Sequence, residues 1–212
     1  MQVETLIIWD WDNTLNNTKN SVHKGLNDTM QHFGLPLVSE EDVINVMTNH
    51  RGAFWQSRFS LDGDETQVSL PQAIEYYVDC YQKYSNETSL FYDCLDALQF
   101  VKNKNIPQVV LSNKNHESLV KEVTDKGVFD YFEIVKGTTG PIGKPDLEFI
   151  EPVLQQIKPK KVIFVGDGVS DMLMAQKINA TAILVHHKDE VPHDYYCHTL
   201  SEVKDLLSQL IG

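Results

Sequence analysis

Residues 6–15 read Leu6-Ile7-Ile8-Trp9-Asp10-Trp11-Asp12-Asn13-Thr14-Leu15, an apolar run that passes into polar residues. This pattern predicts a buried strand that ends at the edge of a sheet. Side chains two apart in a strand point the same way, so Asp10 and Asp12 can face one pocket. Two close carboxylates repel each other unless a cation or shared proton relieves the charge, and Mg²⁺ is a suitable cation. A simple Asp/Asn turn is the alternative that this stretch leaves open.

The chain beyond residue 90 alternates between short apolar runs and helical stripes of apolar residues. Strand–helix alternation is typical of a Rossmann-like α/β fold, with a parallel sheet and helices on both faces. Four further strands are expected at 108–112, 131–135, 161–166 and 181–185.

The segment 16–88 contains helical patterns and lacks a strand signal. It therefore predicts a helical domain inserted between the first strand and the remaining chain. The α/β core domain would then consist of residues 1–15 and 89–212. The aromatic cluster Phe54, Trp55 and Phe59 is expected to form the core of this insert rather than a surface that stacks on nucleic-acid bases.

The composition limits the classes of partner and location. The chain has 212 residues, a net charge of −12 and no long apolar run, so we expect neither a nucleic-acid nor a membrane partner. The N-terminus lacks the basic segment of a signal peptide, which predicts a cytoplasmic location. Three widely spaced cysteines, Cys80, Cys94 and Cys197, are expected to be buried thiols in a reducing environment.

Polar residues follow several of the expected strands, and ligands of open parallel sheets bind beyond the carboxyl ends of the strands. The residues selected by this rule are Asp10, Asp12, Ser112, Asp167 and Asp171, with Lys144 in a nearby loop. Their residue types fit phosphoryl transfer, which needs an in-line nucleophile, a cation and fixed donors around the phosphoryl oxygens.

Each residue type suggests a role in such a reaction. Asp10 can be the nucleophile, and Asp12 can protonate the leaving alcohol and then accept a proton from water. Asp167 can hold Mg²⁺ with Asp10. Asp171, one helical turn further on, can bind water on the metal or support a neighbour. Individually, such residues also occur as turn formers, helix caps and solvated charges, so the prediction rests on their combination.

Four motifs together resemble those of the haloacid dehalogenase-like superfamily of phosphohydrolases. Asp10-Trp11-Asp12-Asn13-Thr14-Leu15 resembles the first, Leu111-Ser112-Asn113-Lys114 the second, Gly143-Lys144-Pro145-Asp146 the third and Gly166-Asp167-Gly168-Val169-Ser170-Asp171 the fourth. The insert is similar to the C1 cap of the phosphoglycolate phosphatase-like branch, so the resemblance implies that residues 16–88 are a cap domain.

The resemblance also implies site roles. Asp10 would form an aspartyl-phosphate, and Asp12 would be the acid/base. Phosphate would be bound by Ser112, Asn113 and Lys144. Mg²⁺ would be held by the carboxylates of Asp10 and Asp167 and the main-chain carbonyl of Asp12, with Thr14 and Asp171 supporting the metal or its water. Many relatives carry Phe and Gly where this chain has Trp11 and Asn13, although Asn tolerates unusual backbone angles.

Arg51 and the histidine-rich run 186–198 are two further candidates for function. Arg51, beside His50 in the insert, could contact the non-phosphate end of an acidic substrate, or it could be a solvated charge. The histidine-rich run 186–198 has no zinc-ligand spacing and is expected to be a polar surface loop.

The sequence therefore predicts a Mg²⁺-dependent phosphomonoester hydrolase that acts through an aspartyl-phosphate on a small phosphorylated metabolite. Phosphoglycolate is a substrate suggested by the resemblance alone. The alternatives are a phosphomutase with the same residues and, from another class, a phospho-accepting signalling module.

Overall fold

The computed structural model describes residues 3–48, 51–59, 69–187 and 191–211. The chain forms two compact units, one made of residues 1–16 and 90–212 and the other of residues 17–89. Each unit has its own buried apolar core.

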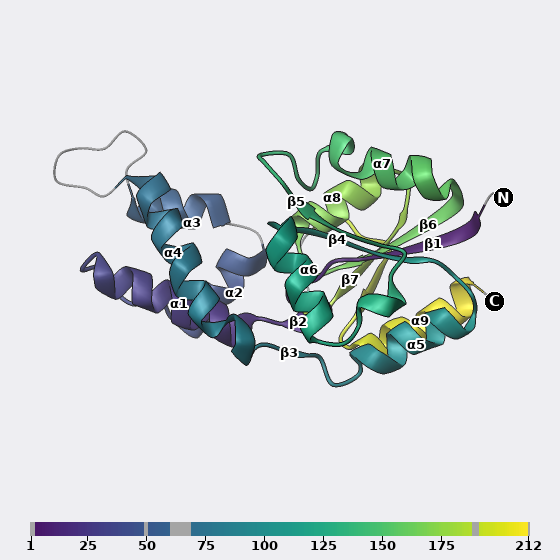
Figure 1. Cartoon of the computed structure of the whole chain (residues 1–212), viewed down its shortest axis with the longest axis horizontal. Helices are drawn as coiled ribbons and strands as arrows, with labels where there is room; N and C mark the ends of the chain where they lie inside the picture. The colour runs from purple at the N-terminus through teal and green to yellow at the C-terminus, as the bar shows by residue number, and fades with distance from the viewer. Residues whose placement is uncertain (1–2, 49–50, 60–68, 188–190, 212) are drawn as a thin grey trace. The chain divides into compact units, whose positions relative to one another are not determined.

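The larger unit is built on a sheet of parallel strands, in the order β5-β4-β1-β6-β7-β8 (Figure 1). The strands are β1 (Val3–Trp9), β4 (Gln108–Asn115), β5 (Ile134–Thr138), β6 (Pro159–Gly166), β7 (Thr181–Val185) and β8 (Tyr195–Cys197). The first strand in the sequence thus lies inside the sheet, between β4 and β6, which explains why residues 6–9 are apolar without interruption.

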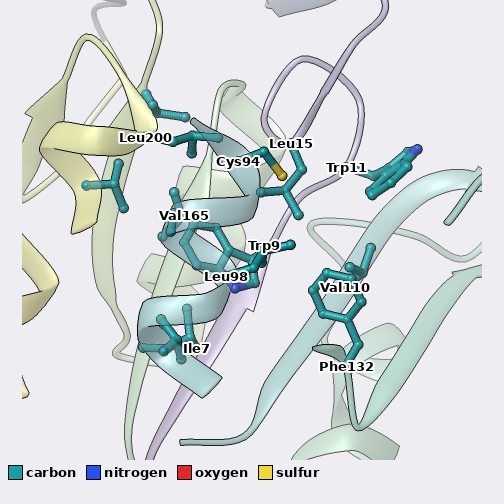
Figure 2. Close-up of a cluster of buried hydrophobic side chains, with 14 of the residues drawn as sticks. Ile7, Trp9, Trp11, Leu15, Cys94, Leu98, Val110, Phe132, Val165 and Leu200 are labelled. Carbon is teal, nitrogen blue, oxygen red and sulfur yellow. The ribbon is translucent and has the colours of Figure 1, made fainter. Parts of the chain in front are cut away.

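Helices cover both faces of the sheet, as the α/β prediction requires. One layer contains α5 (Cys94–Asn103), α6 (His116–Asp125) and α9 (Leu200–Leu210), and the other contains α7 (Leu147–Ile157) and α8 (Val169–Lys177). Alternate side chains of β1 pack against one helix layer or the other. Ile7 and Trp9 pack in the same cluster as Leu98 of α5, as Figure 2 shows, while Leu6 and Ile8 pack in the cluster of α7 and α8.

The smaller unit is helical. It contains α1 (Lys19–His32), α2 (Glu40–Thr48), α3 (Arg51–Arg58), α4 (Leu70–Tyr84) and the short 3₁₀ helix η1 (Ser85–Glu87). The predicted aromatic core is confirmed, because Phe54, Trp55 and Phe59 are buried together with Leu26 and Met30 of α1.

The sequence patterns missed three short strands. β2 (Asn16–Asn17) and β3 (Ser89–Leu90) pair with each other, and β8 extends the main sheet. The strand expected at 131–135 was also misplaced: 3₁₀ helix η2 (Phe129–Tyr131) comes first, and β5 begins at Ile134. Strands of two or three residues are too short to show an alternating pattern, so the periodicity could not detect them.

The prediction of a polar surface loop over 186–198 is wrong in part. His186 is partly buried, its ring stacks on Phe91 with the centroids 3.9 Å apart, and its Nε2 lies 3.0 Å from the carbonyl oxygen of Thr14. Lys188–Glu190 lie outside the described residues, and Tyr195–Cys197 form β8.

The cysteines and the length of the helices bear on the expectations drawn from composition. Cys80, Cys94 and Cys197 are buried free thiols, as predicted. Among the residues that the structure describes, none of the helices combines the length and apolar character needed to cross a membrane.

Candidate active site

The chain places buried polar side chains at the carboxyl ends of adjacent strands. Asp10 follows β1, Ser112 lies in β4, and Asp167 follows β6. The loop after β5 supplies Lys144, and the first turn of α8 supplies Asp171. None of these five residues is more than 7% exposed, although polar groups of these types are normally found in water.

Lys144 joins two of the carboxylates. Its Nζ forms an ion pair with Oδ1 of Asp10 and a second one, at 2.6 Å, with Oδ1 of Asp171. The other oxygen of Asp171 accepts a hydrogen bond from the main-chain N–H of Gly168 at 3.1 Å, which closes the first turn of α8. Asp171 therefore holds Lys144 against Asp10 and is itself fixed by the helix terminus.

The strand end also leaves space for Asp171. A Cβ atom added to Gly166 would lie 2.4 Å from Cβ and 2.5 Å from Cγ of Asp171, closer than carbon atoms can approach. Glycine at the last position of β6 is therefore required for the carboxylate of Asp171 to occupy this place.

The carboxylates carry excess negative charge. Asp10, Asp167 and Asp171 offer oxygens that all lie within 4.8 Å of one another, and Lys144 is their close ammonium partner. Burial raises the pKa of Asp10 to about 7, with the charge of Asp171 adding to the rise and that of Lys144 opposing it. Burial, followed by the charges of Asp10 and Asp171, raises the pKa of Asp167 well above its usual range.

The pKa of Lys144 is also raised, but for Lys144 the cause is the neighbouring charges and not burial. Burial favours its neutral form, but the charges of Asp10 and Asp171 outweigh that effect and raise the pKa of Lys144. The ammonium therefore stays charged, and when all three carboxylates are ionised the cluster still has two negative charges in excess.

This donor set fits Mg²⁺. The ion prefers oxygen ligands and is usually bound by one or two carboxylates, and its double charge matches the excess on the cluster. Lys144 contacts Asp10 and Asp171, whereas Asp167 has Nε2 of His187 as an ion-pair partner at the longer distance of 4.0 Å. Asp167 is therefore the carboxylate of this cluster that most needs a bound cation, and Asp10, which offers an oxygen within 4.8 Å of it, can share the ion.

Asp12 lies outside this three-carboxylate cluster. Its side chain is 30% exposed, and its Oδ1 accepts a hydrogen bond from Nζ of Lys114 at 2.8 Å. The turn that follows Asp12 begins at Asn13, whose φ of 61° is left-handed and whose N–H donates to the carbonyl of Asn16 at 2.7 Å. Asn adopts this conformation more readily than most residues.

Three other residues named from the sequence have structural contacts. The hydroxyl of Thr14 donates to Oδ1 of Asp167 at 3.4 Å. Ser112 accepts the main-chain N–H of Lys114 at 3.2 Å. The amide of Asn113 bonds both the N–H and the carbonyl of Lys144, at 2.6 and 3.1 Å, so it fixes the lysine loop.

One candidate named from the sequence cannot be placed, and two residues of the site were not foreseen. Arg51 begins α3, but its side chain and the whole of His50 lie outside the described residues. Lys114 and Glu122 were missed as members of the site, although Glu122 interrupts the apolar face that Leu119 and Val123 give to α6. A charged residue within an apolar helix face is a signal for a buried ion pair.

Comparisons with known proteins agree with the geometry. The family model described as haloacid dehalogenase-like hydrolase matches residues 7–185. The chain is 21% identical to a phosphoglycolate phosphatase of Rhodobacter capsulatus, covering 95% of each chain, and 25% identical to one of Nitrosococcus oceani, covering 96% of each.

A solved structure shares the fold. A haloacid dehalogenase-like family hydrolase from Streptococcus pneumoniae superposes with a TM-score of 0.83 at 20% identity, covering 96% of this chain and 98% of the other. With a family model that spans most of the chain and an acidic site at the expected strand ends, the protein belongs to the haloacid dehalogenase-like hydrolases.

Proposed function

We propose that the protein is a Mg²⁺-dependent phosphomonoesterase that forms an aspartyl-phosphate on Asp10. The observation that carries the proposal is the buried set of Asp10, Asp167 and Asp171 around Lys144, at the carboxyl edge of the sheet. A phosphoryl group needs a nucleophile and positive charge within reach of each other, and this cluster offers both.

The first half of the reaction transfers the phosphoryl group to the protein. A carboxylate oxygen of Asp10 forms a bond to phosphorus as the bond to the ester oxygen breaks, and Asp12 gives its proton to the departing alkoxide. In the second half, water donates a proton to Asp12 and attacks phosphorus. This step breaks the bond to Asp10 and releases inorganic phosphate.

Cationic groups and hydrogen-bond donors would bind the phosphoryl oxygens or orient the residues that do. Lys144 is positioned by Asp171 and by Asn113, and its ammonium would bind a phosphoryl oxygen beside Asp10. Ser112, buried at the neighbouring strand end, would donate its hydroxyl. When bound to Asp10, Asp167 and the main-chain carbonyl of Asp12, Mg²⁺ would neutralise the negative charge that keeps an anionic substrate from the anionic nucleophile. Thr14 would orient Asp167 through its hydroxyl.

The substrate is proposed to be a small phosphorylated acid, such as phosphoglycolate, because the matched relatives from R. capsulatus and N. oceani carry that name. We propose further that residues 16–88 act as a cap domain that supplies substrate specificity, including Arg51, and that the enzyme works in the cytoplasm. The structural unit 17–89 supports the first part, since it has a core of its own and can vary without changing the catalytic sheet.

The test is phosphate release from a panel of phosphorylated metabolites in Mg²⁺ and in EDTA, with Asp10→Asn as the inactive variant. Asp125→Asn is the matched control, because Asp125 is an exposed carboxylate on α6. We expect Mg²⁺-dependent release that the control retains and Asp10→Asn loses. Release by Asp10→Asn at the wild-type rate would exclude the aspartyl-phosphate. An isomerised product would indicate a phosphomutase, and a single stable phosphate per chain would indicate a signalling module.

A further inference from the structure

A second network of charged groups lies beside the proposed acid/base. Nζ of Lys114 is 2.8 Å from Oδ1 of Asp12 and 2.7 and 2.6 Å from the two carboxylate oxygens of Glu122. The side chains of Lys114 and Glu122 are only 10% and 11% exposed. Because Lys114 bridges two carboxylates that come from different elements, it ties the loop after β1 to α6.

Glu122 is held by groups other than Lys114. Its Oε2 accepts the indole N–H of the fully buried Trp11 at 2.9 Å and the side-chain amide of Asn16 at 3.5 Å. Both donors belong to the loop that also carries Asp12. Glu122 therefore fixes the two ends of this loop and, through Lys114, the side chain between them.

Trp11 gives this network a feature that the first motif alone does not require. A phenylalanine at position 11 could fill the same apolar space, but it has no N–H to donate to Glu122. The buried carboxylate, the indole and the lysine therefore depend on one another, because a buried charge without partners is strongly unfavourable.

We propose that Lys114, fixed by Glu122, is a positioning residue for Asp12. It holds Oδ1 of Asp12, so that Oδ2 carries the proton that passes to the leaving alkoxide and returns from water. The inference rests on the proposed phosphomonoesterase function and adds to it a residue pair outside the nucleophile and metal cluster. A positioned acid matters most when the leaving group is a poor one, since a stable anion departs without protonation.

The experiment compares two esters in wild type, Lys114→Met and Asp12→Asn. One is p-nitrophenyl phosphate, whose leaving group is a stable anion, and the other is the best alkyl phosphate of the metabolite panel. We expect Lys114→Met to lose at least about tenfold more kcat on the alkyl ester than on the aryl ester, and we expect Asp12→Asn to show the same selectivity. Added to Asp12→Asn, Lys114→Met should cause less than about a twofold further loss, because the group it positions is already absent.

Further variants separate positioning from general effects on the fold. Lys114→Arg keeps the cation and should recover most of the alkyl-ester activity. Lys121→Met, on the exposed side of α6, should behave as wild type on both esters. If Lys114→Met does not fold, the double variant Lys114→Met/Glu122→Gln removes both buried charges together and should show the same ester selectivity.

Several results would overturn the inference. Equal losses on both esters would show a structural role, and a rise in KM that persists in Asp12→Asn would show that Lys114 contacts substrate instead. Full alkyl-ester activity in Lys114→Met would show that Asp12 needs no support from it. Wild type that hydrolyses neither ester would contradict the proposed function itself, whereas active wild type with an unselective variant contradicts only the role of Lys114.

Discussion

Asp10 and Asp167 are both buried carboxylates, yet their neighbours differ. Asp10 contacts the ammonium of Lys144, while Asp167 has the hydroxyl of Thr14 at 3.4 Å and Nε2 of His187 at 4.0 Å. Hydroxyl and imidazole groups compensate a negative charge less than an adjacent ammonium does. The ionised form of Asp167 therefore depends most on a cation taken up from solution.

The first prediction concerns Asp167→Asn in metal-free protein. Because burial raises the pKa of Asp167 well above its usual range and that of Asp10 from 3.8 to about 7, the folded state binds more protons than the unfolded state over this interval. Stability in EDTA should therefore fall as the pH rises from about 4 to about 7. At pH 8 the variant should melt about 2–6 °C above wild type in EDTA and should not be stabilised further by Mg²⁺, as thermal unfolding would measure.

The control for this prediction is Asp96→Asn, which removes an exposed carboxylate paired with Lys204. It should keep the wild-type pH dependence and the wild-type response to Mg²⁺. A variant Asp167→Asn that still gains stability from Mg²⁺ would assign the metal to other ligands.

Residue identity predicted part of this site and missed the rest for a physical reason. Asp10, Asp167 and Lys144 follow strands or lie in loops near strand ends, so the sheet rule brings them together without any knowledge of contacts. Lys114 in β4 reaches Asp12 because β4 pairs with β1, and Glu122 reaches Lys114 because α6 packs beside β4. Periodicity gives the buried face of a helix but not the atom that a long side chain reaches.

At the scale of elements, the end of β6 and the start of α8 behave as one unit. Gly166 leaves the space that Asp171 fills, and Asp171 accepts the N–H of Gly168 and contacts Lys144. The geometry of the helix start thus determines where the lysine lies.

The second prediction is that Gly166→Ala displaces Asp171. Its Cβ would lie within 2.6 Å of three atoms of that carboxylate side chain, so either the strand end or the side chain must move. We expect turnover to fall at least about tenfold, since a misplacement near 1 Å can cost still more, and the free energy of unfolding to drop by roughly 1–3 kcal/mol. Gly140→Ala, where an added Cβ meets no atom within 4 Å, should show neither effect in urea unfolding and phosphate-release assays. Wild-type turnover in Gly166→Ala would mean that Asp171 does not set the position of Lys144.

The sequence patterns predicted the long strands and helices and missed the short strands. Strands β1, β6 and β7 are long enough to show as apolar runs, and the helices show as stripes, so the α/β class followed from the sequence. β8 consists of Tyr195–Cys197 and follows a run of histidines that resembles a polar loop. Its place is determined by pairing with β7, which is a tertiary contact.

At the scale of the whole molecule, charge opposes part of the proposed chemistry. The chain carries a net charge of −12, so its long-range field attracts a divalent cation and repels a phosphorylated substrate. The site must overcome this repulsion at short range, which the buried ammonium of Lys144 and a bound metal ion would do.

The third prediction follows from the sign of that field. Raising KCl from about 10 to about 150 mM shortens the screening length from about 30 to about 8 Å. The KM for a phosphorylated substrate should fall and the Mg²⁺ concentration for half-maximal rate should rise, each by about two- to fivefold, in steady-state assays at constant pH. Because the two ligands have opposite charges, a shift of both constants in the same direction would show a general salt effect on the enzyme instead.

The strand order has a consequence for the protein as it is being made. β1 is synthesised first, but it lies between β4 and β6, whose residues begin at Gln108 and Pro159. Roughly 100 residues separate β1 from its first partner in the sequence. At a translation rate of 5–20 residues per second, the partner is therefore synthesised about 5–20 s after β1. During that time Leu6, Ile8 and Trp9, which are fully buried in the finished sheet, have no strand to pair with. The nascent chain is therefore most prone to aggregation, and most in need of chaperones, while the helical insert is being translated.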